Sequence, residues 1–318
     1  MRKINWGIIS TGTIAHSFAL DFKHVQEGNL IAVASRSMDK AREFANQYDI
    51  DTAYSSYEAL YNDPRIEAVY IATPHNFHLK NASDALRAGK AVLCEKPLTV
   101  SPGECKQLIQ LANLTGNYLM EAMWTYFLPP ILKAQEWVKS GLIGAIKHIK
   151  ADFGYAVPFD ACGRMYNPGL AGGALLDMGI YPIAAAWLFY RKDPLSWHVI
   201  ARKATTGVDN DVVMLLRYED EVASLTTSFR SKLPNYLYII GTKGYIQIPD
   251  FWRARECLLY LGEECTRHYI DPRTSAGFNF EIDAVNRDIL HGRKESGIMP
   301  HAYSLKFQEM MEQVRGFF

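Results

Sequence analysis

The sequence predicts an α/β protein with two parts: a doubly wound parallel sheet at the N-terminus, and then a second α/β domain with a large, open, mostly antiparallel sheet. Short apolar runs alternate with helical patterns through residue 121, as in proteins built of β-α-β units. From residue 146 onward, long alternating runs rich in β-branched and aromatic residues appear instead. We therefore place the domains at residues 1–121 and 122–318.

Composition limits the class of protein. A chain of 318 residues suggests about two domains, and 48% hydrophobic with 21% charged residues is typical of soluble globular proteins. The formal net charge is zero, so nothing indicates a nucleic acid or an acidic membrane surface as partner. No apolar run approaches the roughly 20 residues of a membrane span.

The five cysteines form no C-x-x-C pair, which argues against a zinc site and against a disulfide framework. The N-terminus runs directly into an apolar strand, and no signal peptide is apparent. We expect a cytoplasmic protein without a bound metal.

The chain begins with a strand at residues 5–9, a tight turn, and a helix through residue 22. The turn fits the dinucleotide fingerprint G-x-G-x-x-G/A at Gly12 and Ala15, while Ser10 replaces the first glycine. Gly12 would let the backbone approach a pyrophosphate, and the helix N-terminus would offer it free N–H groups. The alternative is a glycine-containing turn that binds nothing.

A second strand at residues 30–34 ends in Ser35-Arg36-Ser37. The fingerprint expects an acidic residue near here for the ribose hydroxyl, and none is present. A carboxylate would repel a 2′-phosphate, whereas the planar guanidinium of Arg36 would bind it. The sequence thus favours NADP over NAD, unless Arg36 is an ordinary surface residue. Ser37 is a suitable N-cap for a helix at residues 39–48.

A third strand, at residues 68–72, leads into Thr73-Pro74-His75 and a helix over residues 81–88. Proline at a strand end before a helix repeats the pattern of a nucleotide-binding edge. Here His75 and His78 either line the cofactor or are polar residues of a first helical turn.

Residues 91–94 form a fourth, apolar strand, and Glu95-Lys96-Pro97 follows at once. Proline ends a central strand because it cannot donate to the ladder, so Lys96 is expected at the carboxyl end. Ligands of open α/β sheets bind outside these ends, and we assign Lys96 to the reaction centre. The alternative is a lysine that points into water. Ser101 and Pro102 then open another helix, and residues 118–120 form the last strand of this half.

The second half is predicted to be a sheet of neighbouring hairpins. A large open sheet with few helices makes a dimer plausible, because one face needs cover. A helix is expected before it at residues 131–139 and another at the end of the chain, over residues 302–317. The predicted strands are residues 146–153, 199–204, 212–218, 222–229, 236–240, 245–248 and 258–260.

Two glycines, Gly172 and Gly173, precede a possible helix that carries Asp177 and Tyr181. The glycines permit close approach of another group. Asp177 and Tyr181 are four residues apart and share a face if the segment is helical. Tyrosine, with a pKa near 10, is a poor base at neutral pH, but an ammonium group within roughly 4–6 Å favours the phenolate. The alternative is a buried tyrosine and an internal helix carboxylate.

In order and spacing, these motifs resemble the Gfo/Idh/MocA family of oxidoreductases over essentially the whole chain. Within the family, the sequence looks closest to the branch of dimeric dihydrodiol dehydrogenases and D-xylose 1-dehydrogenases. That branch has tyrosine where much of the family has histidine at the position of Tyr181, and it tolerates serine at Ser10. One departure is Tyr126, where the branch usually has arginine after Trp-Thr. The other segments that carry the resemblance are 6–8, 91–97, 121–125, 172–177 and 241–244.

The resemblance implies an N-terminal Rossmann domain that binds NAD(P), and a C-terminal domain for substrate binding and dimerisation through its open sheet. It implies Lys96 and Tyr181 as the catalytic pair, with Asp177 orienting the pair or the substrate. The predicted cofactor contacts are Ser10, Gly12, Thr13, Ile14, Ser35, Arg36, Ala72, Thr73, Pro74, His75, His78, Glu95, Lys96, Met123 and Trp124.

The functional hypothesis is reversible hydride transfer between nicotinamide and a sugar, a vicinal diol or a related carbonyl compound, with NADP as the expected cofactor and NAD possible. Two rival hypotheses are an NADP-binding regulatory protein without turnover and a cofactor-dependent glycosidase-like enzyme. The expected assembly is a homodimer. The candidate substrate contacts are Trp124, Phe153, Tyr155, Arg164, Asp177 and Phe278.

Overall fold

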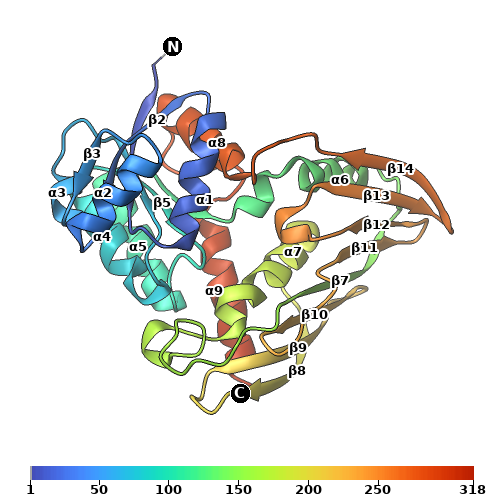
Figure 1. The fold of residues 1–318 in the computed structure, drawn as a ribbon. Helices are drawn as coiled ribbons and strands as arrows, with labels where there is room; N and C mark the ends of the chain where they lie inside the picture. The colour runs from blue at the N-terminus through green and yellow to red at the C-terminus, as the bar shows by residue number, and fades with distance from the viewer. Residues whose placement is uncertain (1) are drawn as a thin grey trace. The chain divides into compact units, whose positions relative to one another are not determined.

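Two sheets organise the chain in the computed structural model, which describes residues 2–318 (Figure 1). The first compact unit contains the chain up to Trp124 together with Arg273–Gln308, and the second contains Thr125–Pro272 and Glu309–Phe318. The first sheet is parallel and the second is mostly antiparallel, so the predicted fold class is confirmed.

The sheet of the first unit has the strand order β3-β2-β1-β4-β5-β6, and all its strand pairs are parallel. The direction of winding reverses between β1 and β4, which is the place where doubly wound folds bind nucleotides. The strands β4, β5 and β6 are buried at every residue, because helices cover both faces of such a sheet. The strands are β1 (Ile4–Ile9), β2 (Gly28–Ala34), β3 (Thr52–Tyr54), β4 (Ala68–Ile71), β5 (Ala91–Glu95) and β6 (Leu119–Ala122).

Serine side chains cap three helices of this unit. Ser37 accepts a hydrogen bond from the Lys40 N–H, and Ser101 accepts one from the Glu104 N–H, so the cap predicted at Ser37 and the helix start predicted at Ser101 are confirmed. Ser56 caps a short helix in the same way. The helices are α1 (Thr13–Asp21), α2 (Met38–Gln47), α3 (Tyr57–Tyr61), α4 (His78–Arg87) and α5 (Pro102–Thr115).

The chain returns to the first unit near its end, which the sequence analysis did not anticipate. The helix α8 (Phe278–Leu290) packs against α1 and β2. The buried carboxylate of Asp21, at the end of α1, accepts hydrogen bonds from the backbone N–H groups of Gly277 and Phe278 at 2.7 and 2.9 Å. Asp21 therefore supplies the cap of α8 from a distant part of the sequence.

The second sheet has the order β14-β13-β12-β11-β7-β10-β9-β8. Its neighbours are antiparallel except β7 and β10, which pair in parallel. The helices α6 (Pro129–Lys139) and α7 (Ile180–Tyr190) contact the sheet on one side (Figure 1). The strands are β7 (Ile146–Gly154), β8 (Ser196–Lys203), β9 (Asp209–Arg217), β10 (Val222–Ser228), β11 (Leu237–Gly241), β12 (Tyr245–Ile248), β13 (Glu256–Leu261) and β14 (Glu264–Ile270).

One helical stretch, Pro168–Tyr190, is long and apolar enough to cross a membrane by length and composition alone. The sequence expectation that no segment approaches this size was therefore wrong. However, 78% of its most apolar window is buried inside the structure, as in the core helix of a globular protein. The last helix, α9 (His301–Arg315), lies where the sequence predicted a terminal helix.

Candidate functional site

The first turn of the chain has the geometry that a dinucleotide requires. Ser10 has a φ of 86°, in the left-handed region that favours glycine, at the position where the fingerprint has its first glycine. The Ser10 hydroxyl accepts a hydrogen bond from the Gly12 N–H at 3.3 Å, a local contact that helps to hold this unusual conformation. The substitution of glycine by serine therefore keeps the shape of the turn.

The helix that follows begins without a side-chain cap. Gly12 is the N-cap of α1, and no side chain there accepts a hydrogen bond from the helix N–H groups. A Cβ built on Gly12 would lie 3.5 Å from the Ser10 Oγ and 4.0 Å from the Ala72 carbonyl oxygen, both ordinary contacts, so nothing crowds this glycine. An uncapped and uncrowded helix N-terminus fits the pyrophosphate of a dinucleotide.

The end of β2 carries the residues that the sequence predicts as ribose contacts. Ser35 is buried and its Oγ accepts from the Ser37 N–H at 3.4 Å, while Arg36 is exposed. The guanidinium of Arg36 lies near enough to Tyr57 to oppose the rise that burial causes in the pKa of that tyrosine. An exposed arginine at this strand end is able to bind a phosphate.

His78 joins two of the predicted loops. Its side chain is fully buried, its Nδ1 lies 2.8 Å from the carbonyl oxygen of Pro97, and its Nε2 lies 2.8 Å from that of Thr73. Asn81 adds a hydrogen bond to the Thr73 hydroxyl at 3.0 Å. This arrangement gives His78 a structural role. Its predicted contact with the cofactor, like that of the buried neighbour His75, stays a prediction.

Lys96 follows β5 directly, at the carboxyl end of the sheet, where the sequence placed it. Its backbone N–H donates to the Glu95 carboxylate at 3.2 Å, and the Lys96–Pro97 peptide bond is cis. Tyr70, on the neighbouring strand β4, donates its hydroxyl to the same carboxylate in a short hydrogen bond. Burial raises the pKa of Tyr70 well above its usual value, so this hydroxyl keeps its proton.

Two aromatic residues of the first unit, Trp124 and Phe278, stack with ring centroids 4.5 Å apart and planes within 8°. Both were predicted to contact substrate, and Trp124 the cofactor as well. The Asp21 cap fixes the backbone of Phe278, and the Phe278 ring also meets Phe18 edge to face. Met123, also a predicted cofactor contact, directly precedes Trp124 in the sequence and is fully buried.

In the second unit, Tyr181 lies in the first turn of α7, directly after a π-helical segment at Leu175–Gly179 that contains Asp177. The expected simple helical spacing of Asp177 and Tyr181 is therefore modified by a π-bulge, a feature that is frequent at functional sites. The Asp177 carboxylate pairs with the Arg164 guanidinium at 3.0 Å. The structure thus joins two residues that the sequence had proposed separately.

The glycines before this segment allow the close approaches that the sequence indicated. A Cβ on Gly172 would meet the Met165 carbonyl oxygen at 2.6 Å. Gly173 has a φ of 128°, and a Cβ there would lie 2.5 Å from the Asp209 carboxylate. Asp209 also accepts from the Leu175 N–H at 2.6 Å, and burial raises the pKa of its carboxyl group. Asp209 is a support for this segment that sequence reasoning missed.

An aromatic cluster surrounds Tyr181 within the second unit. Phe153 meets Tyr181 edge to face with centroids 5.2 Å apart and stacks on Trp252 at 5.0 Å. Tyr155 meets both Phe153 and Trp252 edge to face. Trp252 was not predicted. The only signal in the sequence was an aromatic pair, Phe251-Trp252, in a short segment between predicted strands.

Tyr126 stands where the resembling branch usually has arginine. Its side chain is almost fully buried, and its hydroxyl donates to the Ala184 carbonyl oxygen at 2.6 Å. Ala184 is one turn beyond Tyr181 on α7. Tyr126 therefore supports the helix that carries Tyr181.

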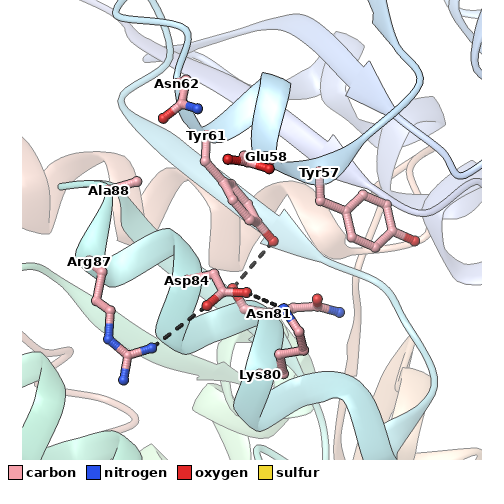
Figure 2. Close-up of a pocket in the computed structure, with 9 residues that line it drawn as sticks. All are labelled: Tyr57, Glu58, Tyr61, Asn62, Lys80, Asn81, Asp84, Arg87 and Ala88. Carbon is pink, nitrogen blue, oxygen red and sulfur yellow. Dashed lines mark hydrogen bonds and ion pairs between the residues drawn. The ribbon is translucent and has the colours of Figure 1, made fainter.

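Figure 2 shows a pocket of about 450 Å³ between α3 and α4. Its cations, Lys80 and Arg87, both pair with Asp84, at 2.6 and 3.6 Å, and the Tyr61 hydroxyl donates to the Asn81 carbonyl oxygen. None of the predicted site residues lines this pocket, so we assign it no part in the reaction. Within residues 2–318, no group of three or more His, Cys, Asp or Glu side chains is placed to hold a metal ion.

A six-stranded sheet in the order 3-2-1-4-5-6, with an open turn after β1 at its switch point, defines a dinucleotide-binding protein. Residues 4–123 match an oxidoreductase family with an NAD-binding Rossmann fold, and residues 131–247 match the GFO/IDH/MocA C-terminal domain. The chain belongs to the Gfo/Idh/MocA family and is an NAD(P)-dependent oxidoreductase, as the resemblance in the sequence indicated.

Similar proteins extend over the full length. Trans-1,2-dihydrobenzene-1,2-diol dehydrogenase of Mus musculus is 36% identical over 324 residues, which cover 98% of this chain and 96% of that protein. The protein of the same name from Homo sapiens is 35% identical over 328 residues, with the same coverage.

Two solved structures share the fold over nearly the whole chain. An aldose-aldose oxidoreductase from Caulobacter crescentus, in complex with glycerol, superimposes with a TM-score of 0.91 at 23% identity, covering 99% of this chain and 97% of that one. The 3-ketoreductase KijD10 from Actinomadura kijaniata, in complex with NADP and TDP-benzene, has a TM-score of 0.87 at 25% identity and covers 99% and 98%.

Proposed function

We propose that this protein is an NADP-dependent dehydrogenase or reductase of a secondary alcohol in a vicinal diol or a sugar, with Lys96 and Tyr181 as its catalytic pair. The observation that carries the proposal is the full-length similarity, at 36% identity, to dihydrodiol dehydrogenases, in a chain that has Lys96 at the carboxyl edge of its Rossmann sheet. The oxidation converts the carbinol to a carbonyl group with loss of a hydride and a proton.

Each residue of the pair has one task. Tyr181 receives the hydroxyl proton of the alcohol as general base and returns it in the reverse direction. The Lys96 ammonium stabilises the phenolate form of this tyrosine and donates a hydrogen bond to the substrate oxygen. Asp177, held by Arg164 at 3.0 Å, orients the substrate hydroxyl groups. NADP, when bound, accepts the hydride.

The preference for NADP rests on Arg36. The exposed guanidinium follows β2 where an acidic residue would bind the ribose of NAD, and the nearby Ser35 and Ser37 supply hydroxyl groups. Replacing Arg36 by alanine is expected to lower kcat/KM for NADP by about 10- to 100-fold, since hydrogen bonds to charged groups contribute about 1.5–3 kcal/mol. Arg42→Ala, an exposed arginine on α2, is the control.

The test of the proposed function is NADP reduction, followed by absorbance, with trans-dihydrodiols, D-xylose, D-glucose and inositol as substrates and NAD in parallel. Turnover that is lost in Tyr181→Phe and in Lys96→Met supports the proposal. NADP binding without turnover would instead favour a regulatory protein. Release of a sugar without net cofactor reduction would favour glycosidase-like chemistry, and better turnover with NAD would contradict the role of Arg36.

The proposal includes a homodimer formed through the outer face of the second sheet. Val213 and Leu215 on β9 point away from the buried face, and Ile200, the cross-strand partner of Val213, is 72% exposed. Exposed apolar side chains on an open sheet indicate a surface that another subunit covers. Light scattering after gel filtration would detect the dimer, and Ile200→Lys should weaken it. We also propose a cytoplasmic location, because Cys94, Cys162, Cys257 and Cys265 are thiols outside any disulfide.

A further inference from the structure

A buried carboxyl group lies close to Lys96 and is not used by the proposed reaction. Glu121, near the end of β6, is only 1% exposed. In the register of the parallel sheet it stands beside Cys94, two residues before Lys96. Because a buried carboxylate is unfavourable unless it is hydrogen-bonded or paired with a charge, its partners indicate what it does.

The partners of Glu121 belong to the loop that carries Lys96. Glu121 Oε1 accepts a hydrogen bond from the Leu98 N–H at 2.8 Å, and Gln308 of α9 donates to the next carbonyl oxygen, that of Thr99, at 2.6 Å. Ser304 lies one turn before Gln308 on the same face of α9, and its hydroxyl lowers the pKa of the Glu121 carboxyl group. The side chains of Glu121 and Gln308 thus hold the two residues that follow Pro97.

The charge of Glu121 is coupled to that of Lys96. Burial raises the pKa of the Glu121 carboxyl group to about 7, whereas the Ser304 hydroxyl, the Leu98 N–H and the Lys96 ammonium each lower it. The neighbouring Glu95 acts in the opposite direction. Opposite charges in a buried site attract more strongly than in water, so an ionised Glu121 is attracted to the Lys96 ammonium.

We propose that Glu121 is a positioning residue for Lys96: its ionised carboxylate anchors the Leu98 N–H and attracts the lysine side chain, and the reaction is faster when Glu121 is ionised. This inference rests on the proposed function, in which Lys96 acts on the substrate. Glu121 itself does not contact the reacting atoms, because its contacts are with the loop and with α9.

The groups that face Glu121 come from two elements. From β5 and its end come Cys94, Glu95 and Lys96, and burial raises the pKa of Cys94 well above its usual value. On α9, His301 is the titratable side chain that contacts the same strand: its Nε2 lies 2.9 Å from the carbonyl oxygen of Leu119, two residues before Glu121. A pH effect that is weakened in a Glu121 variant but unchanged in a control variant identifies Glu121 among these groups.

The experiment is a pH profile of kcat for Glu121→Gln, which keeps the size and the acceptor oxygen but has no titrating carboxyl group. Wild-type kcat for alcohol oxidation should rise between about pH 6 and pH 8, where Glu121 loses its proton. In the variant this rise should be weakened, and kcat at the upper pH should be about 10-fold lower. NADP affinity should stay within about two-fold, since the fingerprint turn is unchanged. A wild-type profile in Glu121→Gln would overturn the proposal.

A second variant keeps the carboxylate and changes only its partner. Ser304→Ala removes the hydroxyl that lowers the pKa of Glu121, so the rise in kcat should move to higher pH; an unmoved rise would count against the proposal. Asp288→Asn is the matched control, because Asp288 is a buried carboxylate of the same unit that bonds Tyr118 at the opposite end of β6. The pH profile of kcat for Asp288→Asn should equal that of the wild type. Thermal unfolding of each variant shows independently whether the variant is folded.

Lys96→Met separates failure of this inference from failure of the proposed function. If Lys96→Met retains wild-type turnover, the proposed function is wrong. If Lys96→Met is inactive while Glu121→Gln keeps the wild-type pH profile, the proposed function stands and the role of Glu121 is wrong.

Discussion

The imidazole of His78 lies 2.8 Å from the carbonyl oxygen of Pro97, and its other ring nitrogen lies 2.8 Å from the carbonyl oxygen of Thr73. His78 therefore ties the loop that carries Lys96 to the loop after β4. Both partners are acceptors, so a neutral ring donates to one of them at a time. His78 therefore supports, through hydrogen bonds, the loop that carries the candidate catalytic lysine.

Replacing His78 by alanine should destabilise the protein by about 2–4 kcal/mol, because it leaves two buried carbonyl groups without this donor and opens a cavity. Urea unfolding measures this change. His291→Ala is the control, since His291 is exposed at the end of α8 and should change stability by no more than about 0.5 kcal/mol. Equal stability of the two variants would contradict the role of His78 in holding the two loops together.

Gly12 offers a test that separates cofactor binding from folding. Its φ is −78°, and a Cβ there would be in ordinary contact with Ser10, so Gly12→Ala should fold with an unfolding free energy within about 1 kcal/mol of wild type. The added methyl group would occupy the approach of the pyrophosphate, and NADP affinity should fall at least about 10-fold.

Gly103→Ala is the matched control for Gly12→Ala. Gly103 also lies near a helix N-terminus, and a Cβ there would meet only Ser101 Oγ at 4.0 Å. Titration calorimetry should find wild-type NADP affinity in this control. If Gly12→Ala also binds like the wild type, the cofactor does not approach the turn after β1.

Tyr126→Phe tests whether this position supports α7. The change removes the hydrogen bond from the Tyr126 hydroxyl to Ala184 and leaves a buried carbonyl group, so stability should fall by about 1–2 kcal/mol. Calorimetric unfolding measures the loss. NADP affinity should not change, and a variant with normal stability but weak NADP binding would show that Tyr126 serves the cofactor instead.

The local parts of the fold could be predicted because local physics determines them. An apolar run that ends in Glu95-Lys96-Pro97 must be a strand that stops there, and serine before a helical pattern makes the caps at Ser37 and Ser101. The turn at Ser10 and Gly12 was predicted from spacing, although its positive φ at a serine could be known only from the structure.

Features that depend on contacts between distant segments could not be predicted. The cap of α8 comes from Asp21, more than 250 residues earlier, and nothing in the local sequence of α8 indicates this donor–acceptor pairing. The parallel pairing of β7 with β10 also needs long-range information, because a sheet of hairpins is the simpler expectation. Trp252 was missed for the same reason: only the fold places it beside Phe153.

Glu121 also makes stability depend on pH. Its pKa rises from 4.5 to about 7 on folding, so the folded protein binds more protons than the unfolded chain between these values. The contribution of this group to the unfolding free energy is therefore largest below about pH 4.5 and is lost as pH rises through 7, by an amount on the order of 3 kcal/mol. Relative to wild type, Glu121→Gln should gain stability as pH rises from 5 to 8, which urea unfolding at four pH values would show. Asp288→Asn should show no such gain, and a constant difference between Glu121→Gln and wild type would mean that Glu121 does not titrate in this range.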